Sequence, residues 1–119
     1  MKTPEFDIKK RTFTFELETV RFCNSLRVSE TEFILTKQLI RSATSVGANV
    51  RESRNAESKK DFIHKLSIAQ KETNESCYWL ELLMELYPKQ QSQAKELHSE
   101  SDELLKILSA MIINSKKSM

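Results

Sequence analysis

The sequence predicts an all-α protein that folds as an up-and-down antiparallel four-helix bundle. Its 119 residues include one glycine and two prolines, too few for the tight turns that join β-strands. Charged residues make up 30% of the chain, a content typical of amphipathic helices with one face in water. The gaps between the predicted helices are short, and short connections make sequence neighbours antiparallel. We therefore expect a single four-helix-bundle domain over residues 1–119.

The first two helices are marked by residues that favour helix N-termini. Thr3 is a suitable N-cap and Pro4 is favoured at the first helical position, so the first helix is expected at about 4–27. The segment Ser29–Glu32 has the serine and glutamate of a capping box, in which each side chain accepts a hydrogen bond from the other residue's backbone N–H. It predicts a second helix at about 30–55.

The last two helices are separated by a proline. Ser58 and Asp61 repeat the spacing of serine and acid, and they open a third helix expected at about 59–87. Pro88 lacks a backbone N–H and ends that helix. The remaining periodic segment predicts a fourth helix at about 91–115.

The third predicted helix carries two apolar stripes. One is wide enough to face a bundle core, and about 135° away lies a second stripe. A helix in a monomeric bundle needs one buried stripe, so the second predicts a subunit interface; an imperfect stripe with a few exposed aromatic residues is the alternative. The core stripe comprises Phe62, Leu66, Ala69, Thr73, Cys77, Leu80, Met84 and Tyr87. The predicted interface residues are Ile68, Trp79, Leu82 and Leu86.

The first predicted helix supports the same interface prediction, because its apolar residues divide between nearly opposite faces. A helix with two apolar faces can bury one in the bundle and the other against a second subunit. One face holds Phe13, Leu17 and Val20, and the other holds Ile8, Phe15, Phe22 and Leu26.

The single glycine, Gly47, falls inside the second predicted helix. Glycine in mid-helix costs about 1 kcal/mol relative to alanine, so a site that keeps it needs the missing Cβ. Gly47 lies beside an apolar stripe and next to the small side chain of Ala43. We therefore expect another helix to approach closely at this point.

A row of polar residues follows the same helix at spacings of four, four and three residues, which places them on one side. Two glutamates of the third helix are suitable partners, since a carboxylate can pair with arginine and an amide can both donate and accept. This pattern predicts an interhelical network, and a ligand pocket is the alternative. The predicted network comprises Arg41, Ser45, Asn49, Glu52, Glu72 and Glu75.

Positive charge concentrates in the first part of the chain. Residues 1–71 contain 14 Lys and Arg against 9 Asp and Glu, whereas residues 72–119 contain 5 against 8, and the net charge is +2. A cluster around the turn between the second and third helices predicts sequence-nonspecific, salt-sensitive binding of RNA or DNA, and a solvated helix surface is the alternative. The candidate residues are Arg51, Arg54, Lys59, Lys60, Lys65 and Lys71.

Catalytic and metal-binding patterns are absent from the sequence. Di-metal bundles use two Glu-x-x-His motifs, whereas this chain has only His64 and His98 and a single Asp61 at the corresponding spacing from His64. We therefore expect no enzyme activity and no cofactor. Cys23 and Cys77 are far apart and outside any CxxC motif, which favours reduced thiols in the cytoplasm. No apolar stretch is long enough to cross a membrane.

One segment resembles a known family. Residues 38–83 read QLIRSATSVGANVRESRNAESKKDFIHKLSIAQKETNESCYWLELL and closely resemble the four-helix-bundle proteins encoded in intervening sequences of bacterial 23S rRNA genes, also called S23 ribosomal protein-like. Tyr78, Trp79 and Leu80 fit one branch of that family. The matching positions are Arg41, Ser45, Ala48, Asn49, Glu52, Ser58, Lys59, Lys60, Phe62, Ala69, Glu72 and Glu75.

The resemblance implies a short up-and-down bundle that assembles as a ring-shaped homopentamer. Related accessory subunits of diversity-generating retroelements bind nucleic acid and a reverse transcriptase, although they are strongly basic. Many relatives have glycine where this chain has Ser53, so we expect the second helix to continue further here. The expected function is a non-catalytic homo-oligomeric interaction module for a partner encoded nearby; the alternative is a sequence-nonspecific nucleic-acid-binding accessory protein.

Overall fold

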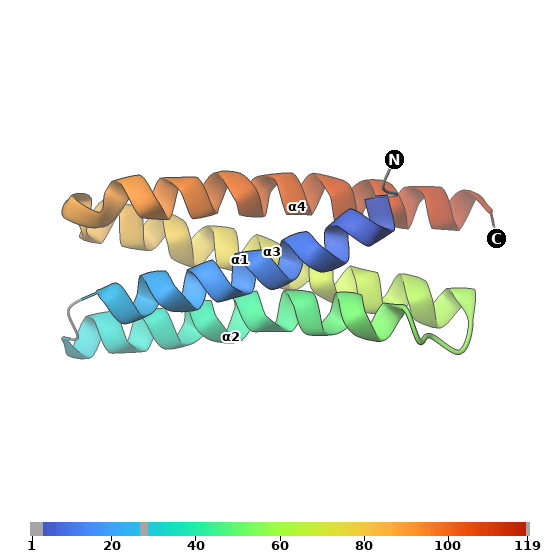
Figure 1. Cartoon of the computed structure of the whole chain (residues 1–119), viewed down its shortest axis with the longest axis horizontal. Coiled ribbons are helices and arrows are strands. Elements are labelled where there is room, and N and C mark those ends of the chain that lie inside the picture. Colours follow the sequence, from blue (N-terminus) through green and yellow to red (C-terminus); the bar gives the residue numbers. More distant parts are fainter. Residues whose placement is uncertain (1–3, 27–28, 119) are drawn as a thin grey trace.

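The computed structural model describes residues 4–26 and 29–118, and every secondary-structure element in these ranges is helical. The α-helices are α1 (Pro4–Ser25), α2 (Glu30–Ser53), α3 (Lys59–Leu86) and α4 (Gln91–Lys117), with a short 3₁₀ helix, η1 (Pro88–Gln90), before α4. Sequence neighbours run antiparallel, and α1 also packs against α4 (Figure 1). The predicted all-α four-helix bundle is therefore confirmed.

The caps form largely as the sequence predicts. The Ser29 N–H donates to the Glu32 carboxylate at 2.9 Å, and the Glu32 N–H donates to Ser29 Oγ at 3.2 Å, which completes the capping box. Ser58 caps α3 by accepting a hydrogen bond from the Asp61 N–H at 3.0 Å. The predicted cap Thr3 lies outside the described residues.

Helix ends differ from the expected boundaries by one or two residues. Helix α2 was expected to continue to about residue 55. Its α-helical part ends at Ser53, and the N–H groups of Arg54 and Asn55 bond three residues back, which tightens the last turn. Helix α4 extends past its expected end to Lys117, because lysines in the last turn favour a helix C-terminus. Helices α1 and α3 end at Ser25 and Leu86.

The core lies on the predicted faces. On α1, Phe15 is buried while Phe13 and Leu17 are exposed, so only one of the two predicted apolar faces enters the bundle. On α3 the predicted core stripe is buried or partly buried, and Ile63 and Leu83 join it as buried residues that the predicted stripe omitted. The interior thus buries one apolar face of each helix and leaves the second apolar faces of α1 and α3 at the surface.

The bundle is a rod with extents of 47 × 26 × 18 Å. The α2–α3 turn and the end of α4 lie at one end of the rod, with the start of α1 set back from it, and the α1–α2 and α3–α4 connections lie at the other end (Figure 1). Residues far apart in the sequence are therefore brought together at each end.

Candidate functional site

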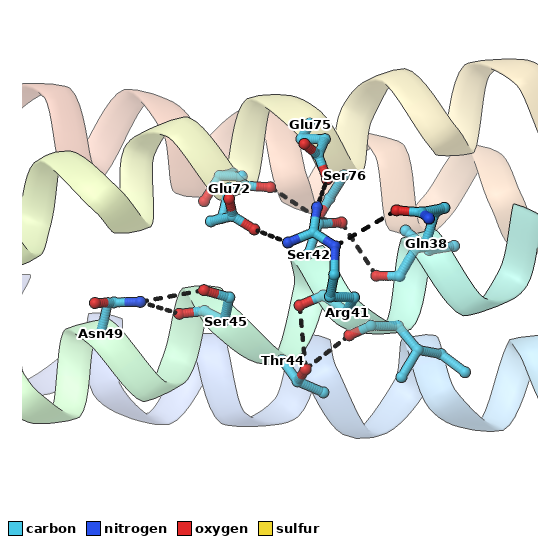
Figure 2. Close-up of polar contacts among 12 residues, drawn as sticks. Gln38, Arg41, Ser42, Thr44, Ser45, Asn49, Glu72, Glu75 and Ser76 are labelled. Atoms are coloured by element: carbon cyan, nitrogen blue, oxygen red, sulfur yellow. Dashed lines mark hydrogen bonds and ion pairs between the residues drawn. The ribbon is translucent and has the colours of Figure 1, made fainter.

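An arginine of α2 is held between two carboxylates of α3. Arg41 Nη1 lies 3.1 Å from Glu72 Oε2, and Arg41 Nη2 pairs with Glu75 Oε2. Figure 2 shows the guanidinium pointing from α2 toward both glutamates. We call Arg41, Glu72 and Glu75 the arginine clamp. Three of the six residues predicted for the interhelical network therefore do form one.

The arginine clamp lies at the edge of the core. The Arg41 side chain is 51% exposed, whereas the Glu72 side chain is 11% exposed. The Trp79 indole N–H donates to Glu75 Oε2 at 3.3 Å. Behind the clamp the buried hydroxyls of Ser42 and Ser76, which the sequence analysis missed, bond at 2.8 Å. Their only sequence signal is a small polar residue within each core-facing stripe. The clamp is accordingly a half-buried link between α2 and α3.

The other three predicted network residues do not reach the clamp. Asn49 Nδ2 donates within α2 to the Ser45 carbonyl at 2.9 Å and to Ser45 Oγ at 3.2 Å (Figure 2). Glu52 pairs with Lys65 Nζ at 3.1 Å. Each residue advances a helix by 1.5 Å, so Asn49 lies about 12 Å along α2 from Arg41, beyond the reach of the same two carboxylates. The single continuous network expected from the spacing was therefore wrong.

Gly47 faces a carboxylate. Its backbone N–H donates to Glu16 Oε1 at 2.6 Å, and a Cβ added to Gly47 would lie 2.6 Å from the Glu16 carboxyl carbon. The predicted close approach of another helix exists: α1 meets Gly47 through the side chain of Glu16. Glu16 was not predicted from the sequence, because its only signal there is its place beside the buried face of α1.

The Glu16 carboxylate lies in a groove between α1 and α2 with a volume of about 340 Å³. Burial raises the pKa of Glu16 to about 7, although the hydrogen bond from Gly47 and the positive charge of Arg51 each lower it in part. Lys9, Phe13 and Arg51 line the same groove. The groove therefore holds a carboxyl group that titrates near neutral pH.

The predicted nucleic-acid-binding residues do not form one patch. Arg51, Arg54, Lys59 and Lys60 are exposed around the α2–α3 turn. Lys65 is paired with Glu52, and Lys71 is about 16 Å further along α3 from Lys60 at the usual helical rise. Of the six predicted residues, only Arg51, Arg54, Lys59 and Lys60 therefore lie together at the end of the rod that carries the α2–α3 turn.

The predicted interface residues of α3 lie at the surface to different degrees. Leu86 is 51% exposed, Ile68 and Leu82 are half-buried, and Trp79 packs partly against the core. Ile34 of α2 is also exposed. Phe13 and Leu17 of α1 and Phe33 of α2 are exposed as well, with Phe13 lining the groove beside Gly47.

Side chains that could hold a metal ion are not gathered in the described part of the chain. No group of three or more His, Cys, Asp or Glu side chains within residues 4–26 and 29–118 gathers closely enough to hold a metal ion. His98 pairs with Glu81 at 2.9 Å, and His64 is exposed. Of the helices that the structure describes, none has the length and apolar character needed to span a membrane.

Comparison with known proteins identifies a family and a similar solved structure. The family profile described as 23S rRNA-intervening sequence protein matches residues 4–110. A solved structure of a protein of unknown function from the S23 ribosomal protein family of Bacteroides thetaiotaomicron is similar, with a TM-score of 0.85 and 38% sequence identity over 92% of this chain and 98% of that one. No curated protein matches the chain.

Proposed function

This chain belongs to the family of 23S rRNA-intervening sequence proteins, and from that premise we propose that it is a non-catalytic, homo-oligomeric interaction module of the cytoplasm. Its partners are copies of itself, in a pentamer as the family resemblance implies, and a macromolecule encoded nearby. The observation that carries the proposal is the pair of apolar faces that the bundle leaves at its surface.

The two apolar faces lie on different sides of α2. On the α1–α2 side, Phe13 is 55% and Phe33 is 56% exposed. On the α2–α3 side, Ile34 of α2 and Leu86 of α3 are exposed, and Trp79 of α3 is partly buried. Single exposed apolar residues are normal, but groups of them on defined faces are typical of subunit contacts. Two dissimilar faces favour a heterologous contact, which closes into a ring when the rotation between subunits permits.

The arginine clamp supports a structural role for the predicted polar row. A catalytic acid or base must exchange a proton with a substrate, whereas Glu72 and Glu75 are both engaged by the guanidinium of Arg41. The clamp also joins the two helices that carry the α2–α3 apolar face. Its contribution to function is therefore to hold the interaction surface in place.

Light scattering after size exclusion tests the proposal. For a chain of 13.9 kDa, a pentamer has a mass of about 70 kDa. We expect this mass at tens of micromolar protein, and we expect Leu86→Ser to shift the protein to smaller species. Ile113→Ser is the matched control, because Ile113 is 54% exposed but lies on α4, away from both apolar faces.

A parent protein with a mass near 14 kDa would overturn the proposal, as would equal loss of assembly in the Leu86 and Ile113 variants. Circular dichroism on both variants separates loss of assembly from loss of the fold.

A further inference from the structure

Positive charge is gathered at one end of the rod. The α2–α3 turn and the end of α4 lie there, the start of α1 lies on the same side of the rod but short of its end, and each contributes basic side chains (Figure 1). We call this set the basic end: Lys9, Lys10, Arg51, Arg54, Lys59, Lys60, Lys116 and Lys117. Four of these lysines, on α1 and α4, were not among the residues that the sequence singled out, because their sequence positions are distant from the α2–α3 turn.

Contacts tie the elements of the basic end together. Lys59 Nζ lies 2.5 Å from Ser118 Oγ, which places the end of α4 beside the start of α3. A hollow of about 420 Å³ is lined by residues of all four helices, including Ile8, Arg54 and Met111. Of the basic end, Arg54 and Lys59 line this hollow, and Lys9 and Arg51 line the groove between α1 and α2.

Basic residues outnumber acidic ones at this end, and some of the acidic groups are engaged. Glu5 and Asp7 belong to the start of α1, and the acidic residues around the α2–α3 turn are Glu52, Glu57 and Asp61. Glu52 is paired with Lys65, and the Asp61 carboxylate accepts the Glu57 N–H at 3.3 Å. A surface of this kind projects a positive potential that steers an approaching polyanion.

The opposite end of the rod has no comparable excess of positive charge. Its acidic residues come from the start of α2, the end of α3 and the start of α4, beside the basic residues Arg21, Lys89 and Lys95. These acidic residues are Glu30, Glu32, Glu81, Glu85 and Glu96. The charge of the protein is thus separated along the length of the bundle, although the net charge is only +2.

We propose that the basic end binds the sugar-phosphate backbone of a nucleic acid, end-on to the bundle. The rod is 26 × 18 Å in cross-section, and a duplex carries one phosphate charge per about 1.7 Å, so about 15 phosphates can cross the longer dimension. Lysines distributed over that surface match a continuous polyanion. Contacts to phosphates carry no sequence information, so we expect the contact to be independent of sequence.

This site does not require self-association, because one bundle carries all of it. A ring would place several basic ends on one face and multiply the phosphate contacts. Assembly and nucleic-acid binding are therefore separate properties with separate tests, and light scattering can fail while binding persists.

Fluorescence anisotropy with a labelled DNA duplex tests the inference. We expect the parent protein to bind, with the logarithm of its association constant falling linearly as salt rises from about 50 to about 200 mM. Lys116→Gln/Lys117→Gln and, independently, Lys9→Gln/Lys10→Gln should each lower affinity several-fold at low salt and reduce the salt slope by about 2. The matched control, Lys89→Gln/Lys95→Gln, removes the same charge from the opposite end.

If the Lys89→Gln/Lys95→Gln control binds the duplex as the parent protein does, the inference is supported. Absence of duplex binding by the parent at low salt, or equal losses in the control and the two test variants, overturns it. Competition by polyglutamate at a similar charge concentration would also overturn it, because the partner would then be an acidic protein. Circular dichroism of each variant establishes that the bundle is intact.

Discussion

Replacing Glu16 with glutamine should remove a pH-dependent loss of stability. The groove between α1 and α2 raises the pKa of Glu16 from its ordinary value of 4.5 to about 7, mainly through burial. A carboxyl group whose pKa is raised by folding binds its proton more tightly in the folded than in the unfolded state. Its contribution to stability therefore falls as the pH rises from about 4.5 to about 7, and the full cost is present above that window.

The size of this cost follows from the change in pKa. One pKa unit corresponds to about 1.4 kcal/mol, so a change from 4.5 to about 7 has an upper limit of about 3 kcal/mol. Glu16 is only half-buried, and screening by water reduces the expected cost to about 1–2 kcal/mol. Glutamine keeps an oxygen that can accept the Gly47 N–H without carrying a charge.

Urea denaturation at pH 4.5 and pH 8, at one protein concentration, measures the effect. We expect Glu16→Gln to be more stable than the parent by about 1–2 kcal/mol at pH 8 and close to it at pH 4.5. Glu18→Gln is the matched control, since Glu18 is exposed on the same helix. A difference between parent and Glu16→Gln that is the same at both pH values would refute the reasoning, because other titrating groups cancel in that difference.

Three further substitutions test the packing of the bundle by the same denaturation assay. Gly47→Leu should be less stable than Gly47→Ala by about 1–3 kcal/mol, because the leucine must displace more than the flexible end of Glu16; equal stabilities would contradict this. Arg41→Ala should cost about 1–3 kcal/mol by leaving the buried Glu72 carboxylate without its partner, and an unchanged melting temperature would argue against the clamp. Thr19→Val should add about 1 kcal/mol, since the buried Thr19 hydroxyl has no hydrogen-bond partner among the described residues; a less stable variant would show that the hydroxyl is satisfied.

Local features of the fold could be predicted from the sequence because they depend on residues a few positions apart. The Ser29–Glu32 capping box is complete within one turn of helix, and the structure confirms it. The core-facing stripe of α3 follows from helical periodicity, and Leu66, Ala69 and Leu80 are fully buried. The pairing of Arg41 with Glu72 and Glu75 also followed, since opposite charges faced each other on adjacent helices.

Features that join distant segments were decided by the tertiary structure. Helical periodicity places a residue on a face, but the axial register between two helices determines which residue it meets. The sequence marked Gly47 as unusual, yet only the packing of α1 on α2 identified Glu16 as its neighbour. The same limit explains why Asn49 pairs with Ser45 rather than with α3.

The distribution of charge shows most clearly what the sequence determined and what the tertiary structure decided. Counting along the chain places an excess of positive charge in residues 1–71, whereas the folded bundle adds Lys116 and Lys117 from the acidic second part of the sequence to the same end. Antiparallel packing brings the end of α4 beside the start of α3, as the contact between Lys59 and Ser118 records. The composition and helical pattern of this protein determined a four-helix bundle, and only the alignment of its helices decided where the charge would gather.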